Sequence, residues 1–202
     1  MITRIKAISN LEKYLNQDLR KLALDFSITT FETGKQNKGW KGQVLERLAG
    51  LENNNKKAPN GLGFELKSVS FEMKKDVLVP RETMAITMLN QKELVNDSFF
   101  ESHCWEKLKS LVFCAVLWTG HNQEEAKFIK ATSFDFLEND EIIKEIEADY
   151  EFIRQKLVTQ GFESLTGKDG KWIQARTKGA GHGTTSRAFY ARKELVKIIF
   201  GV

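Results

Sequence analysis

The feature that most constrains the fold of this chain is the run at residues 111–118, in which every residue is apolar. A strand with one face in water alternates apolar and polar residues, whereas a strand buried on both faces reads as a continuous apolar run. Residues 111–118 are therefore predicted to form a central strand of a sheet. Further strands are expected at 82–89 and 172–175, and the chain is expected to fold as one α/β domain.

Helices are predicted where apolar residues recur every three or four positions. Residues 3–26 fit two short amphipathic helices, and residues 137–160 fit one long helix. A helix before residue 50 is expected to end at Gly50, because glycine readily adopts the conformation of a helix C-cap. Residues 101–110 and 187–200 are also expected to be helical.

Composition and length bound the class of protein. The chain of 202 residues is 41% hydrophobic and 29% charged, as in an ordinary globular domain. No apolar run reaches membrane-spanning length and the N-terminus lacks a signal-peptide core, so we expect a cytoplasmic protein with no membrane partner. Cys104 and Cys114 lack metal-ligand spacing and are expected to be reduced and buried.

The net charge of +4 is unevenly distributed along the chain. Residues 167–202 contain eight Lys or Arg and two acidic residues, whereas residues 122–151 contain ten acidic residues and three Lys. A basic terminal segment of this kind suits a polyanionic partner. Two solvated helix faces of opposite sign would give the same pattern, so charge alone leaves both interpretations open.

Glu65 and Lys67 are the residues that most suggest catalysis, within a stretch at 63–68 that is expected to be a strand. Residues two apart on a strand point to the same face. A carboxylate beside an ammonium can hold a divalent metal ion and orient a water molecule, as metal-dependent phosphodiester hydrolysis requires. A solvated ion pair is the commoner reason for the Glu-x-Lys spacing, so the motif alone is weak.

Two further oxygen-bearing side chains line up with this strand. Glu46 lies near the end of the helix before Gly50, and Asn60 closes the loop that leads into the strand. Oxygen atoms are the ligands that Mg²⁺ prefers. A bound Mg²⁺ would polarise the scissile phosphate and lower the pKa of a water, and Lys67 would stabilise the developing charge.

Several blocks, in a fixed order, resemble the family that includes MutH, the strand-nicking endonuclease of mismatch repair, and type II restriction endonucleases related to MvaI and BcnI. In chain order these blocks are Lys38-Gly-Trp40 with Gly42 and Glu46, Leu62-Gly-Phe-Glu-Leu-Lys67, Ser102-His-Cys-Trp-Glu-Lys-Leu-Lys109, Arg176-Thr-Lys178 and Arg187-Ala-Phe-Tyr190. The resemblance implies a restriction-endonuclease-like α/β fold, with a mixed central sheet flanked by helices and two lobes around a DNA cleft. Within a single domain, 1–202, it implies a catalytic lobe at about 1–120 and a recognition lobe at about 121–202.

The resemblance also implies roles for matching positions. Glu46, Glu65 and the residue at position 60 would bind Mg²⁺, and Lys67 would be the catalytic lysine. The residues expected to contact double-stranded DNA are Lys38, Lys107 or Lys109, Arg176, Lys178, Arg187 and Tyr190. His182, in a glycine-containing loop at 178–186, is a further candidate for DNA contact, although a plain surface loop is the alternative.

Three departures from the family pattern bear on activity. Position 60 is Asn where the family has Asp, and a neutral amide binds a hard cation more weakly than a carboxylate. We expect an engineered, inactivating Asp-to-Asn change here, because the rest of the site is intact; a natural loss of activity is the alternative. The spacing from position 60 to Glu65 is two residues shorter than in MutH. The segment between Lys178 and Tyr190 is also shorter, and Ala85 stands where MutH has a base-contacting phenylalanine.

The sequence therefore predicts a Mg²⁺-dependent, site-specific DNA endonuclease that leaves a 5′-phosphate. The shorter spacings favour a type II restriction enzyme over a MutH-type nickase, which would need repair proteins as partners. A DNA-binding module without catalytic activity is the third interpretation.

Overall fold

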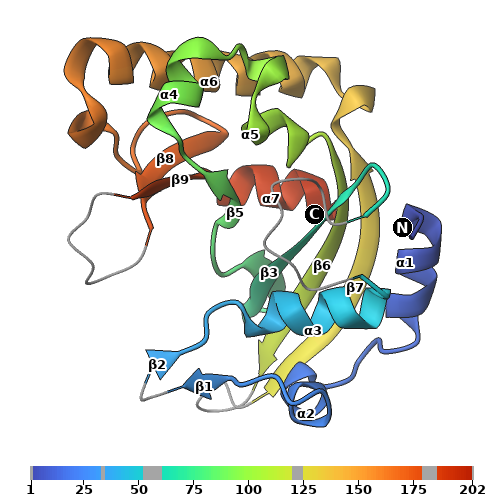
Figure 1. The fold of residues 1–202 in the computed structure, drawn as a ribbon. Coiled ribbons are helices and arrows are strands. Elements are labelled where there is room, and N and C mark those ends of the chain that lie inside the picture. The colour runs from blue at the N-terminus through green and yellow to red at the C-terminus, as the bar shows by residue number, and fades with distance from the viewer. Residues whose placement is uncertain (1, 33–34, 52–60, 120–124, 179–185, 202) are drawn as a thin grey trace. The chain divides into compact units, whose positions relative to one another are not determined.

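The computed structural model describes residues 2–32, 35–51, 61–119, 125–178 and 186–201 (Figure 1). The chain forms two compact units, and each is made from two separate stretches of sequence. Unit 1 contains Met1–Glu82 and Leu111–Phe134, and unit 2 contains Thr83–Ser110 and Asp135–Val202. The resemblance implies a different division, near residue 120, into a catalytic lobe and a recognition lobe. That division is defined by function and stays a prediction.

Unit 1 is built on a four-stranded sheet with the strand order β4-β3-β6-β7. Its strands are β3 (Glu65–Lys74), β4 (Val77–Pro80), β6 (Ser110–Thr119) and β7 (Glu125–Asp135). β3 runs parallel to β6 and antiparallel to β4, so the sheet is mixed, as predicted. β6 lies between two other strands and its residues 111–116 are buried, which confirms the prediction from its apolar run.

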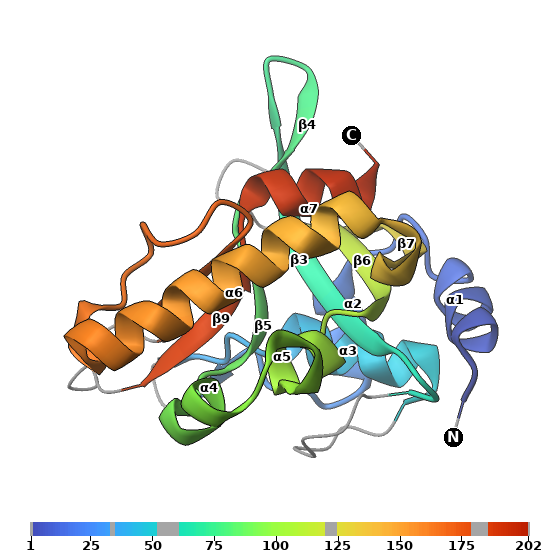
Figure 2. The same cartoon turned by 90° about the horizontal axis from the view of Figure 1, so that it is seen from above.

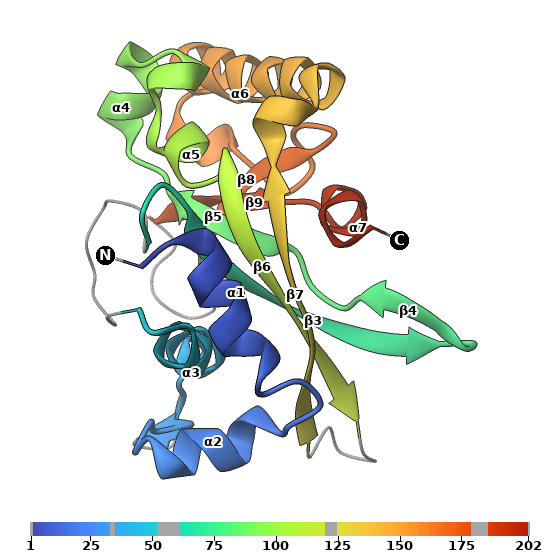
Figure 3. The ribbon, with the colours of Figure 1, turned by 90° about the vertical axis from the view of Figure 1, so that its right-hand side faces the viewer.

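Three helices of unit 1 contribute to its apolar core: α1 (Arg4–Glu12), α2 (Leu19–Asp25) and α3 (Trp40–Ala49) (Figure 3). Their apolar side chains form one cluster with Leu66 of β3 and with Val112 and Val116 of β6. α3 ends where the sequence predicts, because Gly50 adopts a φ of 84° and its N–H bonds back to the carbonyl of Arg47. A short hairpin, β1 (Phe31–Glu32) and β2 (Lys35–Gln36), precedes α3.

Unit 2 contains a three-stranded antiparallel sheet with the order β5-β9-β8. The strands are β5 (Met84–Met88), β8 (Ile173–Thr177) and β9 (Arg187–Ala191). Its helices are α4 (Gln91–Asn96), α5 (His103–Glu106), the long α6 (Asp140–Gln160) and α7 (Lys193–Phe200) (Figure 2). Single 3₁₀ turns, η1 (Phe99–Glu101), η2 (Phe136–Glu138) and η3 (Phe162–Ser164), complete the described elements.

The predicted helix at 187–200 is wrong over its first five residues. Arg187–Ala191 forms β9, and only Lys193–Phe200 is helical. β9 is hydrogen-bonded on one edge to β5 and on the other to β8, and this pairing outweighs any local preference for helix. The predicted helix at 101–110 is also shorter than expected, since its α-helical part is limited to His103–Glu106.

Both cysteines match the prediction, since Cys104 and Cys114 are reduced and buried. Burial raises the pKa of the Cys114 thiol, so its reactive thiolate form is strongly disfavoured. Within the described ranges, the helices are too short or too polar to cross a membrane.

Candidate active site

β3 brings Glu65 and Lys67 together in unit 1. The Nζ atom of Lys67 lies 3.1 Å from Oε1 of Glu65, and the two side chains are only 15% and 7% exposed. Glu65 is therefore buried and Lys67 is largely enclosed, unlike the members of a solvated surface pair. Removing two charges from water costs free energy that their mutual attraction must offset, so burial of this pair needs a reason beyond surface solubility.

The position of the pair follows from the alternation of β3. Leu66 points into the core cluster shared with Val112, so its neighbours Glu65 and Lys67 point to the opposite face of the sheet. In register, Glu65 is the partner of Leu111 and Lys67 the partner of Phe113. Because this part of β3 is hydrogen-bonded to the buried strand β6, the two charged side chains are held on a rigid support.

A second Glu-x-Lys pair on the same strand shows what the spacing alone produces. Lys74 Nζ lies 3.0 Å from Glu72 Oε1, but the Lys74 side chain is 64% exposed. This pair sits beside the tight turn at Lys75 and Asp76, both of which have positive φ angles. The two pairs share spacing and ion-pair distance, so burial is the property that distinguishes Glu65 and Lys67.

Only some of the other residues expected at or near the metal site lie in the part of the chain that the structure describes. Glu46 is half-buried on α3, which packs against β3, and Lys38 is exposed just before α3. Asn60 lies outside the described residues. Among the residues that the structure describes, no three His, Cys, Asp or Glu side chains are grouped so that they could hold a metal ion. The oxygen donors of Glu46 and Glu65 are of the kind Mg²⁺ takes, and the complete ligand set stays a prediction.

In unit 2, the pairing of β8 with β9 brings together Arg176 and Tyr190. The Arg176 guanidinium lies 4.3 Å from the centre of the Tyr190 ring, and its Nη2 donates to Thr83 Oγ1 at 2.9 Å. Lys178 follows β8 as an exposed residue, and its N–H donates to the carbonyl of Ser186 at 3.0 Å. Three of the expected DNA-contact residues are thus carried by one hairpin framework, and their DNA contacts stay predictions.

Arg187 is placed differently from these three residues. It is 4% exposed, and its guanidinium donates to the carbonyl of Leu165 at 2.9 Å and to backbone and side-chain oxygens of Glu163 at 3.2 Å. It also lies over the ring of Phe162. In the described structure its Nη1 is buried without a hydrogen-bond partner. These contacts favour a structural role, and DNA contact by Arg187 stays a prediction.

The remaining candidates lie in or near α5 and in the loop after β8. Lys107 is the half-buried C-cap residue of α5, and Lys109 Nζ pairs with Glu106 Oε1 at 2.7 Å. His182 falls outside the described residues. Both lysines belong to unit 2, whereas Glu65 belongs to unit 1.

Comparison with known proteins confirms the resemblance seen in the sequence. A family model described as "DNA mismatch repair enzyme MutH" matches residues 49–146. A DNA mismatch repair protein MutH of Escherichia coli O17:K52:H18 is 25% identical over 200 residues, which cover 96% of this chain and 84% of that protein. The MutH protein of Haemophilus influenzae strain 86-028NP is 24% identical over 164 residues, covering 80% of this chain and 72% of that protein. The chain is similar to MutH proteins over most of its length.

The MutH family match includes all four strands of the unit 1 sheet, and with them Glu65 and Lys67. Lys107 and Lys109 also fall within the matched residues. Arg176, which unit 2 places beside Tyr190, lies beyond them. The relation to MutH is therefore most direct for the strand that carries the buried pair.

No local pattern in the sequence indicates the framework that holds β8 in place. The carboxylate of Asp149 on α6 accepts hydrogen bonds from the N–H groups of Lys171, Trp172 and Ile173 at 2.7, 2.5 and 2.9 Å. Lys156, also on α6, pairs with Asp169 at 2.6 Å. Lys171 of the basic segment also pairs with Glu145 of the acidic segment at 2.7 Å, so the two segments partly neutralise each other inside unit 2.

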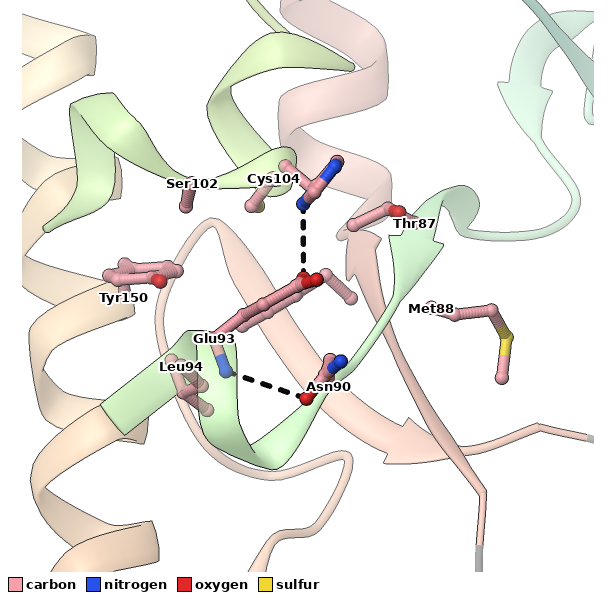
Figure 4. A pocket seen from close by; sticks show the side chains of 10 residues that line it. Thr87, Met88, Asn90, Glu93, Leu94, Ser102, Cys104 and Tyr150 are labelled. Atoms are coloured by element: carbon pink, nitrogen blue, oxygen red, sulfur yellow. Dashed lines mark hydrogen bonds and ion pairs between the residues drawn. The ribbon is translucent and has the colours of Figure 1, made fainter. Parts of the chain in front are cut away.

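Unit 2 contains a shallow pocket, and polar side chains that line it make contacts that join neighbouring elements (Figure 4). Nδ1 of His103 on α5 lies 3.0 Å from Oε2 of Glu93 on α4, so the two side chains join these helices. On another wall, the Tyr150 hydroxyl donates to the carbonyl of Asp97 at 3.3 Å, and burial raises its pKa to about 12. These groups have structural partners, and the catalytic candidates remain those of β3.

Proposed function

We propose that this chain is a DNA endonuclease that hydrolyses a phosphodiester bond at the buried Glu65–Lys67 pair. The observation that carries the proposal is the 3.1 Å contact between the buried carboxylate of Glu65 and the largely enclosed ammonium of Lys67, on a strand within the MutH-matched residues. The relatives are named as DNA mismatch repair proteins, so we propose double-stranded DNA as the substrate.

The proposed role of Lys67 is to stabilise negative charge. As water attacks phosphorus, the bond to the 3′ oxygen breaks and a 5′-phosphate is left on the product. An ammonium fixed beside the phosphate would donate hydrogen bonds to the oxygens on which charge accumulates. Glu65 would hold that ammonium in position before the substrate arrives, and the buried surroundings would strengthen both interactions.

We propose Mg²⁺ as the cofactor, with Glu65, Glu46 and the residue at position 60 as its ligands. When bound, the ion would lower the pKa of a coordinated water and polarise the phosphate. Asn60 offers an amide oxygen where the family has a carboxylate, and it would hold the ion more weakly. We therefore expect the chain with Asn60 to be inactive or impaired.

Two kinds of endonuclease fit this site. The shorter spacing before Glu65 and the shorter segment between Lys178 and Tyr190 favour a type II restriction enzyme, which cuts both strands without help. The mismatch-repair names of the relatives favour a nickase that partner repair proteins activate. A DNA-binding module with a native Asn60 is the non-catalytic alternative.

The test is to incubate the Asn60→Asp variant with supercoiled plasmid and Mg²⁺ and no other protein. We expect cleavage orders of magnitude faster than with Asn60, and loss of cleavage when EDTA removes the metal ion. Linear product would support the restriction enzyme, and open-circular product alone would support the nickase. A folded Asn60→Asp protein that leaves every tested plasmid intact, with and without repair proteins, would refute the endonuclease proposal.

A further inference from the structure

Three cationic side chains of unit 1 converge on one aromatic ring. Arg20 of α2, Lys41 of α3 and Arg81, which follows β4, lie 5.1, 5.4 and 5.8 Å from the centre of the Trp118 ring. A single cation over an indole ring is a common packing contact. Three around one ring concentrate like charges that repel each other. We call these four residues the Trp118 cation cluster.

Lys41 is the fixed member of the cluster. Its Nζ donates to Ser70 Oγ and lies 3.1 Å from Glu82 Oε1, and its side chain is 13% exposed. The same Glu82 oxygen accepts the N–H of Ser70 at 3.1 Å. Burial by itself would raise the pKa of Glu82, but the Lys41 charge and the Ser70 hydrogen bonds outweigh burial and lower that pKa. Glu82 is therefore ionised at neutral pH and offsets the charge of Lys41.

Arg20 and Arg81 bring two further positive charges to the same ring. Their guanidinium groups approach the same ring from different elements, Arg20 from α2 and Arg81 from the end of β4. Planar guanidinium groups bind phosphate oxygens through paired hydrogen bonds, and the ring that both contact restricts their motion. The arrangement suits an anion that offers several oxygens, as a phosphodiester does.

The cluster is separate from the candidate active site. Ser70 and Trp118 follow the alternation of Leu66 and Val116, whose side chains join the core cluster, so they face away from Glu65 and Lys67. The connection to DNA comes instead through α3. Lys41 lies three residues after Lys38, which is exposed and is expected at the entrance of a DNA cleft.

We propose that the Trp118 cation cluster binds backbone phosphates of double-stranded DNA outside the bond that is cut. The inference rests on the proposed function, because it takes DNA to be the substrate. Phosphate contacts carry no sequence information, so the cluster contributes affinity and orientation rather than specificity. It also contributes salt dependence, since each neutralised phosphate releases condensed counterions.

The test measures binding of the Asn60 chain, without metal ion, to a duplex of about 30 base pairs between about 50 and 200 mM salt. Changing both arginines, Arg20→Gln with Arg81→Gln, should reduce the slope of log K against log salt by about 1.8, since one phosphate contact contributes about 0.9. The matched control is Arg47→Gln. Arg47 also lies over an aromatic ring of unit 1, that of Phe26, but as a single cation at 5.2 Å, so its loss should leave the slope unchanged.

A charge-retaining variant separates binding from folding. Arg20→Lys with Arg81→Lys should keep most of the slope, because each lysine still releases counterions. An equal loss in the Gln and Lys variants would assign the cluster to packing and overturn the inference. An unchanged slope in the Gln variant would overturn the inference too. So would a Gln variant that binds DNA normally but no longer binds poly-aspartate, because that result would indicate an acidic protein partner. Plasmid cleavage by Asn60→Asp tests the proposed function separately, so either proposal can fail without the other.

Discussion

Asp149 should be the most stability-sensitive acidic residue of unit 2. Its carboxylate is buried and accepts three consecutive backbone N–H groups at the start of β8. Replacing it with Ala removes the acceptor for all three. An N–H left without a partner costs about 1–3 kcal/mol when it is buried and less where water reaches it. Only the hydrogen bond from Ile173 is fully buried, so Asp149→Ala should lower the free energy of unfolding by about 2–5 kcal/mol. Total stabilities of about 5–15 kcal/mol make that a large fraction.

A neighbouring carboxylate provides the control for this prediction. Glu145 lies one turn earlier on α6 and also contacts Lys171 and Trp172, through their side chains. Its side chain is 47% exposed, so water can replace these contacts when it is changed to Ala. Glu145→Ala should therefore lose far less stability than Asp149→Ala.

The assay is urea unfolding at neutral pH, followed by tryptophan fluorescence and circular dichroism. Asp149→Asn, which keeps one oxygen acceptor but no charge, should fall between the wild type and Asp149→Ala. If Asp149→Ala shifted the urea midpoint no more than Glu145→Ala, the three hydrogen bonds would not hold β8 in place. The argument from buried, unsatisfied N–H groups would then fail for this site.

Three further outcomes are expected. In an active Asn60→Asp background, Lys67→Met should reduce the rate of plasmid cleavage by about 10²–10³-fold. Lys74→Met, in the exposed pair, should leave that rate nearly unchanged. Equal effects of the two substitutions would contradict the argument from burial. Folding lowers the pKa of Glu82, so ionised Glu82 stabilises the protein above about pH 4.5, and this effect is lost as the pH falls through the lowered pKa. In urea unfolding, the wild type should therefore be more stable than Glu82→Gln at pH 7, and the difference should shrink towards about pH 3. Cys104 and Cys114 should react with a thiol reagent only when urea unfolds the protein, and rapid labelling of the native protein would show that these thiols are accessible.

The sequence predicted those parts of the fold that local patterns determine. The apolar run of β6 and the glycine at the end of α3 each carry their signal within a few residues, and both predictions are confirmed. β9 could not be recognised in this way. Its strand conformation depends on β5, about a hundred residues earlier in the chain, and on β8.

The candidate site shows the same limit. The two-residue spacing of Glu65 and Lys67 predicted that their side chains share one face, and the two side chains do pair, but Glu72 and Lys74 have that spacing too. Only the packing of the whole of unit 1 decides which pair is buried. The cations around Trp118 come from several separate segments of the chain, so no short sequence motif predicts that they lie together.

The chain passes between the two units three times, and this restricts how such a protein can be divided. A fragment that stops after Glu82 would contain β3 but lack β6, its hydrogen-bonding partner from Glu65 to Phe71. Half-length fragments of this chain, and chimaeras that contain only one of its two halves, should therefore lose the Glu65–Lys67 pair even when its two residues are retained. During synthesis on the ribosome, the strand that carries the pair must wait for residues 111–117 before it gains that partner.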